Sequence, residues 1–369
     1  MTMNAILAAV ALLLAFMVGF AMKHGGLCTY AAAVQMVRER RLERLMAFLA
    51  AAAFAALLVV PASLLWPHLV RPGGTHGQWA MVLLGGLLLG AGAWLNRGCV
   101  FGTFVQLTGG NLNYVATLAG MVAGALGTRL LWPDAAPVKT LATPLQASLQ
   151  TTGLLAGLWL LLAVIVIWAQ ARRLRRQAAR AQAQGTGNGH GRPAWLEPML
   201  VALVLGAGGG WLFATVNGWD FAAVLIRQAR LASGLAKSGP TLLAVGCALL
   251  MTAGGIAAAV WRERFRLVRP DGRGLLARFG GGGLMGMASV LLPDGNDGLL
   301  LSGIPALAPH ALAGFALMVA SMLALLAWLP NDGGYSINRA AARQAGAGAE
   351  RKDGGRDGRR RNDSPAARA

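Results

Sequence analysis

The chain has 369 residues, of which 56% are hydrophobic and only 13% are charged. Its mean hydropathy is +0.55, whereas an ordinary soluble domain carries about 25% charged residues. The composition excludes a typical soluble protein, so the formal net charge of +19 has to be explained within a membrane protein.

Apolar stretches follow one another along the whole chain. About 20 apolar residues cross the hydrocarbon core of a bilayer as a helix, and backbone groups in lipid must pair within their own segment. We therefore predict an all-α polytopic membrane protein. The first stretch lacks the basic start and the cleavage site of a signal peptide, so we interpret it as a span. The nine predicted spans are residues 5–22, 45–65, 79–95, 112–131, 150–170, 198–215, 239–260, 278–292 and 309–329.

Four basic segments carry most of the net charge: residues 38–44, 171–197, 261–278 and 339–369. Basic loops of membrane proteins stay in the cytoplasm. With all four segments on one side, the N-terminus is expected outside and the C-terminus inside. Membrane topology then accounts for the charge. No nucleic-acid partner is expected, because no soluble domain remains to bind one.

The two halves of the chain resemble each other. Residues 85–121 and 282–318 share a glycine-rich span, a polar break, a short apolar piece, a second break and another span, and residues 23–37 match 217–231 more loosely. Equivalent spans are five places apart in the order of spans, as the first and sixth are, so they cross in opposite directions. We predict the inverted repeat of transporters and channels, four plus one plus four spans.

This pattern divides the chain into five parts. We expect a first membrane repeat over 1–131, a connecting loop and helix over 132–170, and a basic cytoplasmic linker over 171–197. A second membrane repeat covers 198–330. Residues 331–369 form a basic tail rich in Gly, Arg and Asp, a composition typical of disorder.

Each half contains two polar, glycine-containing breaks, and each break precedes a segment too short to span. Such a segment enters the membrane only where protein or water satisfies its backbone. We expect four short membrane-dipping helices that point at one centre, where free N–H groups and positive dipole ends suit an anion.

The first-half breaks each present a cysteine. Cys28 and Cys99 both open a short segment, and Gly98 lets the backbone approach a solute closely. A lone membrane cysteine is usually a small packed hydrophobe, and Cys247, in the middle of a span, is interpreted in that way. The repeated placement of the other two favours a shared role. The spacing of the three cysteines does not match a disulfide framework or a zinc site.

Polar residues surround these breaks. Asn96 and Asn113 offer amide groups to a permeating solute. Arg97 is costly in a bilayer unless it pairs with a carboxylate, attracts an anion or reaches the interface, and these three interpretations stay open.

The second half has Asp220 and the pair Asn296-Asp297 at its breaks, with no cysteine. Intramembrane carboxylates are functional candidates, but they also cap helices or neutralise an arginine. The ATP-binding, metalloprotease and serine-hydrolase signatures do not occur, so we expect no ATP hydrolysis and no cofactor.

The segments "KHGGLCTYAAA", "LNRGCVFGT…GGNLNYV" and "LLPDGNDGLLLSGIPALAPHALAGFALM" together resemble the YeeE/YedE sulfur-transport family over about residues 5–330. The resemblance implies a bacterial inner-membrane protein that takes up thiosulfate along pore cysteines. A small cytoplasmic sulfur-carrier protein is a common partner in that family. Cys28 and Cys99 match the cysteines of its first two motifs. The chain departs from the family at Gly295-Asn296-Asp297, where the transporters carry a further Gly-Cys.

We therefore predict a transporter, not an enzyme, for a small sulfur-containing anion, with thiosulfate as the expected substrate. Two alternatives remain. One is a membrane sulfur-relay subunit in which Cys99 forms a persulfide and hands sulfur or selenium to a cytoplasmic carrier. The other is a membrane scaffold without transport activity, which the missing third cysteine favours.

Overall fold

The computed structural model describes residues 2–70, 75–76, 78–133, 140–141, 153–183, 196–292 and 295–329. Within these residues, nine helices are long and apolar enough to cross a membrane. The prediction of an all-α polytopic membrane protein is confirmed. The predicted disordered tail, residues 331–369, lies outside the described residues.

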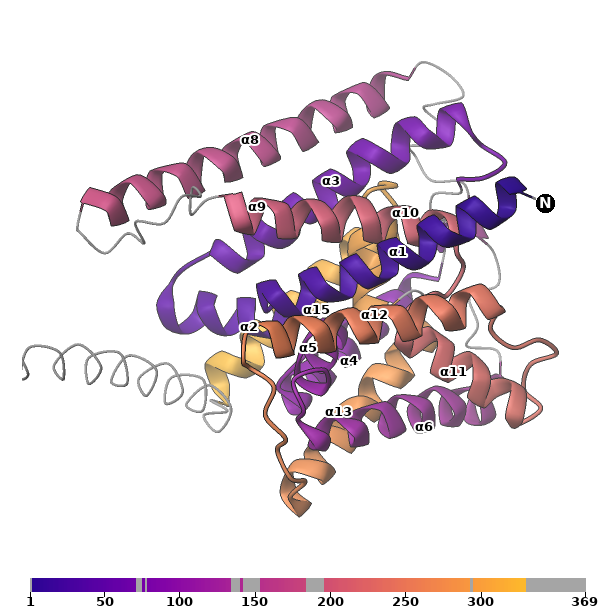
Figure 1. Ribbon diagram of the computed structural model, residues 1–369. Coiled ribbons are helices and arrows are strands. Elements are labelled where there is room, and N and C mark those ends of the chain that lie inside the picture. Colours follow the sequence, from indigo (N-terminus) through magenta and orange to yellow (C-terminus); the bar gives the residue numbers. More distant parts are fainter. Residues whose placement is uncertain are drawn as a thin grey trace, which may run out of the picture. The chain divides into compact units, whose positions relative to one another are not determined.

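The helices of the first half follow the predicted spans and breaks (Figure 1). They are α1 (Thr2–Gly25), α2 (Thr29–Val34), the π-helical turn η1 (Gln35–Glu39), α3 (Glu43–Leu65), α4 (Trp79–Asn96), α5 (Val100–Leu107), the short 3-10 helix η2 (Leu112–Tyr114) and α6 (Val115–Leu131). The connecting helix is α8 (Leu154–Ala183). Two short strands, β1 (Thr75–His76) and β2 (Thr140–Leu141), pair with each other in antiparallel orientation.

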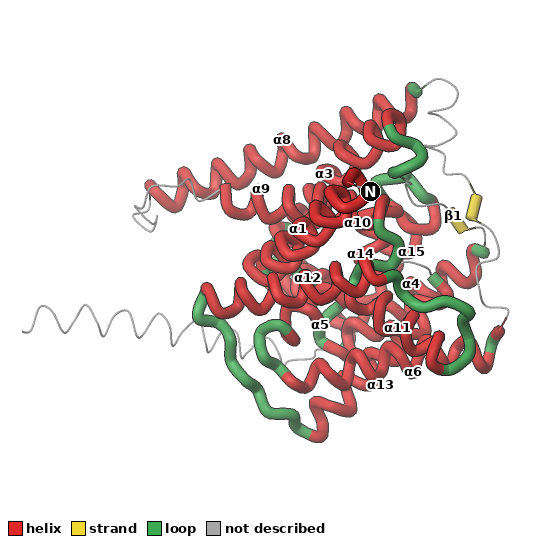
Figure 2. Tube along the Cα trace, turned by 45° about the vertical axis from the view of Figure 1, so that its right-hand side comes forward, coloured by secondary structure: helices red, strands yellow, loops and turns green. Residues whose placement is uncertain are grey.

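The second half repeats this order. It contains α9 (Leu196–Leu203), the π-helical turn η4 (Val204–Gly208), α10 (Gly209–Thr215), α11 (Phe221–Ala232), α12 (Leu242–Trp261), α13 (Gly272–Leu291), α14 (Gly295–Gly298), the π-helical turn η5 (Leu299–Gly303) and α15 (Pro309–Trp328). In Figure 2 the short helices α5 and α14 lie among the long helices.

The largest differences from the predicted boundaries are at the eighth and fifth spans. The eighth span begins at Gly272, not at residue 278, because Asp271 caps it: Asp271 Oδ2 accepts a hydrogen bond from the backbone N–H of Gly274 at 2.8 Å. The predicted start, Arg278, lies six residues after the observed one. In addition, α8 continues to Ala183, so residues 171–183 extend the fifth helix into the segment expected to be a linker.

Helix pairs recur between the two halves. Helix α1 packs closely on α12, where a Cβ at Gly254 would overlap the backbone of Phe16. The equivalent pair is η4 with α3, where a Cβ at Gly206 would overlap the backbone of Ala51. The first span therefore packs on the seventh in the same way as the sixth span packs on the second. A two-fold relation between the two halves requires this correspondence.

The remaining spans obey the same relation. Helix α6 packs on α13, where Gly120 lies against the backbone of Phe279, and α4 packs on α15, where Gly86 lies against Gly314. Helix α4 of the first repeat also packs on α13 of the second, where Gly92 lies against the backbone of Gly281. We call the contact between the two repeats the seam. Small residues let these backbones approach, as is common in membrane helix packing.

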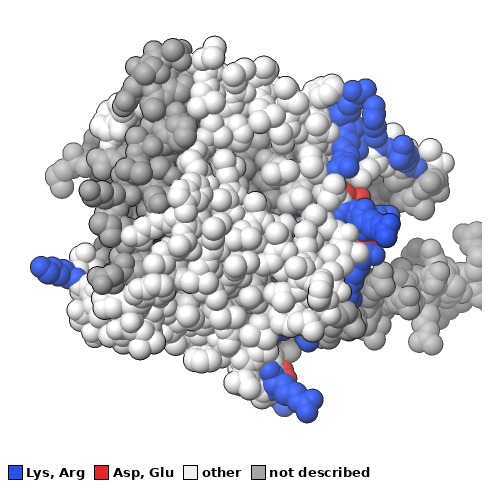
Figure 3. All heavy atoms as spheres, turned by 180° about the vertical axis from the view of Figure 1, so that it is seen from behind, with Lys and Arg blue, Asp and Glu red and all other residues white. Residues whose placement is uncertain are grey.

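Basic side chains gather at one end of the described helices (Figure 3), where residues 38–44, the end of α8 and residues 262–273 lie. Few basic residues lie at the other end. In α11, Arg227 bonds back to the turn that precedes the helix, since its Nη1 donates to the backbone oxygen of Asn217 at 3.2 Å.

Candidate functional site

The first and third breaks share one local geometry. Gly26 has φ +59° and Cys28 follows two positions later; Gly218 has φ +63° and Asp220 follows two positions later. Glycine adopts this left-handed conformation without steric cost. Cys28 is the N-cap residue of α2, and Asp220 is the N-cap residue of α11. The two residues therefore occupy equivalent places in the two repeats.

The second and fourth breaks share the left-handed residue of this geometry, but Asp297 lies inside α14 (Gly295–Gly298) and is not its N-cap residue. Arg97 has φ 55° and precedes Cys99, the N-cap residue of α5, by two positions. Gly295 has φ +58° and precedes Asp297 by two positions. A non-glycine residue in this region is uncommon. Two thiols of the first repeat thus correspond to two carboxylates of the second.

The two thiols of the first repeat meet each other. Cys28 Sγ lies 3.9 Å from Cys99 Sγ, and both side chains are buried. The backbone N–H of Thr29 donates to Cys99 Sγ at 3.3 Å. A Cβ at Gly102 would overlap the Cys28 sulfur, so the absence of a side chain there makes room for the pair. Cys247 is buried in α12, outside this contact.

Asn96 holds the second break in shape. Its Nδ2 donates to the backbone oxygen of Gly98 at 2.7 Å and to Thr103 Oγ1 at 2.9 Å. Its Oδ1 accepts from Thr117 Oγ1 at 2.7 Å. Asn96 is fully buried, so these bonds satisfy an amide that is costly to leave unpaired. The network positions Cys99 at the start of α5.

Asn296 joins the two repeats. Its Oδ1 accepts from the backbone N–H of Val100 at 3.2 Å, which links the fourth break to the second. Its Nδ2 is buried and has no hydrogen-bond partner among the described residues. An unpaired amide donor therefore lies one residue from Asp297, beside the start of α5.

The two carboxylates line a common cavity at the seam. Asp220 and Asp297 border it together with Trp219, Val100 and Phe101. Its volume is about 10 Å³, room for about one water molecule. A larger solute needs local opening to pass. Asp220 also caps α11, since its Oδ1 accepts from the Ala223 backbone N–H at 2.8 Å, so the capping interpretation holds for this residue.

Comparison with known protein families identifies the family of this chain. The family model described as Sulphur transport matches residues 24–324, a stretch that contains all four breaks. The chain belongs to the sulphur transport family. No curated protein matched the chain. The nine apolar helices and the family together make it a multi-pass membrane protein of sulfur transport.

In this sulphur transport protein, Arg97 lies beside Tyr114. The hydroxyl of Tyr114 donates to the backbone oxygen of Arg97 at 3.5 Å, and the Arg278 guanidinium lies 4.8 Å from the Tyr114 ring centroid. Arg97 is half-buried.

Asn113, in η2 of the first repeat, is hydrogen-bonded to the second repeat. Its Oδ1 accepts from the backbone N–H of Asp271 at 3.1 Å. The neighbouring backbone of Leu112 donates to the Val268 oxygen at 3.2 Å. Asn113 thus anchors the loop between α12 and α13 against the start of α6.

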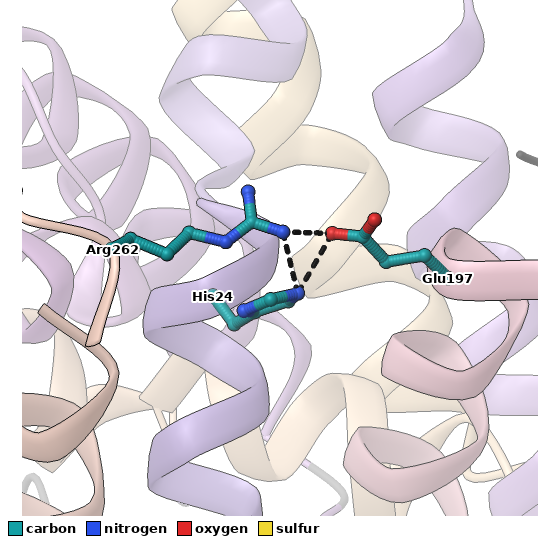
Figure 4. A network of polar contacts seen from close by, with 3 residues as sticks. All are labelled: His24, Glu197 and Arg262. Atoms are coloured by element: carbon teal, nitrogen blue, oxygen red, sulfur yellow. Dashed lines mark hydrogen bonds and ion pairs between the residues drawn. The ribbon is translucent and has the colours of Figure 1, made fainter. Parts of the chain in front are cut away.

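A polar network joins three helices at the end that carries the basic side chains (Figure 4). His24 Nε2 lies 2.7 Å from Glu197 Oε1 and 2.7 Å from Arg262 Nη2, and Arg262 also pairs with Glu197. One ring nitrogen cannot donate and accept at once, so only one of its two contacts is a hydrogen bond in each tautomer. The network connects the ends of α1 and α12 to the start of α9.

Sequence reasoning missed two parts of this site. Trp219 lines the cavity and its indole N–H is buried without a partner in the described structure; its place directly before Asp220 was the available signal. Tyr114 contacts Arg97 and Arg278, but nothing in the sequence distinguishes it from an aromatic residue that only packs in the interior. Among the described residues, no group of three His, Cys, Asp or Glu could hold a metal ion.

Proposed function

We propose that this protein imports a small sulfur-containing anion, with thiosulfate as its substrate, past Cys28 and Cys99. The observation that carries the proposal is the 3.9 Å contact between two thiols from the two breaks of the first repeat. A thiol S–H is a weak donor, suited to the soft terminal sulfur of thiosulfate. Weak successive sites allow a solute both to enter and to leave.

The surrounding groups support an anion path. Trp219 and Asn296 each have a buried N–H donor without a partner in the described chain. Arg97 and Arg278 lie near Tyr114. Unpaired donors in a low-dielectric site attract the oxygens of an oxyanion strongly. We propose that the solute meets the donors first, then the thiols, then the arginines.

We propose a bacterial inner membrane with the N-terminus in the periplasm and the C-terminus in the cytoplasm. The gathering of basic side chains at one end of the helices supports it (Figure 3). In this orientation α1 runs inward and ends before Cys28, while α10 runs outward and ends before Asp220. The thiols then face the cytoplasm and the carboxylates face the periplasm. A small cytoplasmic sulfur-carrier protein is the proposed acceptor at the exit.

The test is uptake of labelled thiosulfate by cells that lack their own sulfate and thiosulfate importers. We expect wild type to take up the label, and Cys99→Ala or Cys28→Ala to abolish uptake. Cys247→Ala is the matched control, because this third cysteine is equally buried but lies away from the pair. Uptake by a well-expressed Cys28→Ala, Cys99→Ala double variant at the wild-type rate would disprove the thiol path.

One contact favours the sulfur-relay alternative. The Thr29 N–H bond to Cys99 Sγ stabilises a thiolate. Such a thiolate attacks the terminal sulfur of thiosulfate, forms a Cys99 persulfide, and releases sulfite as the sulfur–sulfur bond of thiosulfate breaks. Mass spectrometry of Cys99 after exposure to thiosulfate distinguishes the two functions. A gain of one sulfur atom, with no label reaching the cell interior, identifies the relay.

A further inference from the structure

Two arginines lie close together at the end of the molecule that carries few basic side chains. Arg129 is in the last turn of α6, and Arg230 is in the last turn of α11. We propose that they form an oxyanion-binding site, which takes the anion from solution before it reaches the cavity lined by Trp219. In the proposed orientation this end faces the periplasm, so the inference rests on the proposed function and adds the place of first binding.

The path of the chain places both arginines at this end. Helix α6 starts beside the basic loop, where Leu112 bonds to Val268, and it crosses to the opposite side before it ends at Leu131. Helix α12 ends in the same basic loop, so its start and the turn that joins it to α11 are also on the opposite side. Helices α6 and α11 pack on each other and lie side by side (Figures 1 and 2).

Both side chains lie on the less exposed faces of their helices. Arg129 is four residues after Ala125, which is fully buried, whereas Leu131 on the other face is 89% exposed. In α11, the exposed Gln228 lies on the face opposite Arg230. Residues spaced by four share a helix face. The two half-buried arginines are therefore directed toward the protein and away from the lipid-facing positions.

Neither guanidinium has a partner in the part of the chain that the structure describes. The Nε atoms of Arg129 and Arg230 are buried without a hydrogen-bond partner there, and the ion pairs found in that part involve Glu197 at the other end. Arg278 also has a buried, unpaired Nε, but its Nη1 donates to the backbone oxygen of Leu95 at 3.3 Å. A buried donor without an acceptor is costly and calls for a bound water or ion.

The two positive charges act on each other. Arg230 lies within electrostatic range of Arg129, across the contact of α6 and α11. Two like charges held together in partly desolvated surroundings are unfavourable. An anion between them removes the repulsion and accepts hydrogen bonds from both. The planar guanidinium suits this role, because its fork of N–H donors matches two oxygens of one oxyanion.

Arg227 connects this pair to the interior. It lies three residues before Arg230, so the two side chains share one face of α11. Its Nη1 and Nη2 donate to the backbone oxygen and to Oδ1 of Asn217, both at 3.2 Å. Asn217 is two residues before Trp219, which lines the cavity and has a buried N–H without a partner among the described residues. An anion that leaves the pair therefore meets a further positive charge and then an unpaired donor.

Anion binding by the purified protein tests the site without requiring transport. Thiosulfate and sulfate are each expected to raise the unfolding temperature of the wild type in a detergent that contains no phosphate. Arg129→Gln and Arg230→Gln are expected to lose most of this increase. Without anion they are expected to unfold at the wild-type temperature or above it, because the repulsion is gone. Lys237→Gln is the matched control, since it removes one exposed positive charge between α11 and α12.

Uptake of labelled thiosulfate by cells measures what the site contributes to transport. We expect Arg129→Gln and Arg230→Gln each to raise the thiosulfate concentration for half-maximal uptake about tenfold, because electrostatic capture raises the local anion concentration by about that factor or more. The maximal rate is expected to stay unchanged. Arg129→Lys keeps the charge but loses the two-point contact, and an intermediate effect is expected.

A phospholipid phosphate offers similar oxygens, and native mass spectrometry distinguishes it from a soluble anion. One phospholipid that the wild type retains and Arg129→Gln loses, with an unchanged half-maximal concentration for uptake, overturns the proposal. An anion-free Arg129→Gln protein that unfolds far below Lys237→Gln also overturns it, because that result shows a partner for Arg129 within the chain.

The binding and uptake measurements separate the site from the transport function. An undiminished increase in unfolding temperature with anion in both Arg→Gln variants overturns the oxyanion site and leaves thiosulfate transport standing. Thiosulfate binding that depends on both arginines, without uptake by the well-folded wild type, overturns the transport function and leaves the oxyanion site standing.

Discussion

Cys28 Sγ lies 3.9 Å from Cys99 Sγ, although the two residues are 71 positions apart in the chain. Each thiol begins a short helix of its own, so the contact depends on two breaks being held together. Mild oxidation with diamide is expected to join the sulfurs and to stop uptake, because a disulfide fixes both breaks. Mass spectrometry of unreduced peptides measures the link, and thiol reductant is expected to restore uptake.

The control for this cross-link is Cys247→Ala, which leaves the pair intact. If diamide oxidises neither thiol while thiosulfate flux continues, the 3.9 Å contact does not exist in the membrane.

A methyl group at position 102 is expected to disturb the thiol pair. The Cβ of Gly102→Ala would overlap the Cys28 sulfur, and overpacking of this kind costs about 1–3 kcal/mol. We expect slower thiosulfate uptake and a lower unfolding temperature. Gly127→Ala in α6 is the matched control, since a Cβ there meets nothing within 4 Å. Equal uptake by the two variants argues against a crowded pair.

Loss of the Asn96 amide is expected to destabilise the second break. Asn96→Leu removes hydrogen bonds to Thr103 and Thr117 and leaves their buried hydroxyls without these partners; such losses cost about 1–3 kcal/mol per group. Thermal unfolding in detergent measures the effect. Thr128→Val is the comparison, because its hydroxyl bonds only to the carbonyl of Gly124 within its own helix. A smaller effect at Asn96 than at Thr128 contradicts the proposed network.

The His24–Glu197–Arg262 network is expected to contribute little to stability. Glu197 is 58% exposed in its side chain, and exposed ion pairs contribute about 0–1 kcal/mol. We expect Glu197→Gln to lower the unfolding temperature slightly at low salt and not at high salt, because salt screens the charges. Unfolding scans at two ionic strengths measure the difference. A large, salt-independent loss indicates instead that the network fastens the helix ends as a unit.

The sequence was sufficient for the spans, the breaks and the two-fold relation, because each depends on length, hydropathy and glycine placement. It did not predict that Cys28 and Cys99 touch, since side-chain contact depends on how four breaks pack. The left-handed Arg97 was equally hidden, because glycine marks this conformation in the other three breaks and arginine does not. The early start of α13 was missed because a capping residue, Asp271, outweighs the charged residues that follow it.

The four equivalent turns have a consequence for how this molecule arose and what it selects. Duplication of one ancestral half accounts for a backbone that repeats its turns while their chemistry has diverged. One copy carries polarisable sulfur and the other carries oxygen acids. A solute with a terminal sulfur suits the copy that carries the thiols, whereas sulfate, with oxygen on every side, offers that copy no soft sulfur atom. Discrimination between these two anions would then come from divergence after duplication.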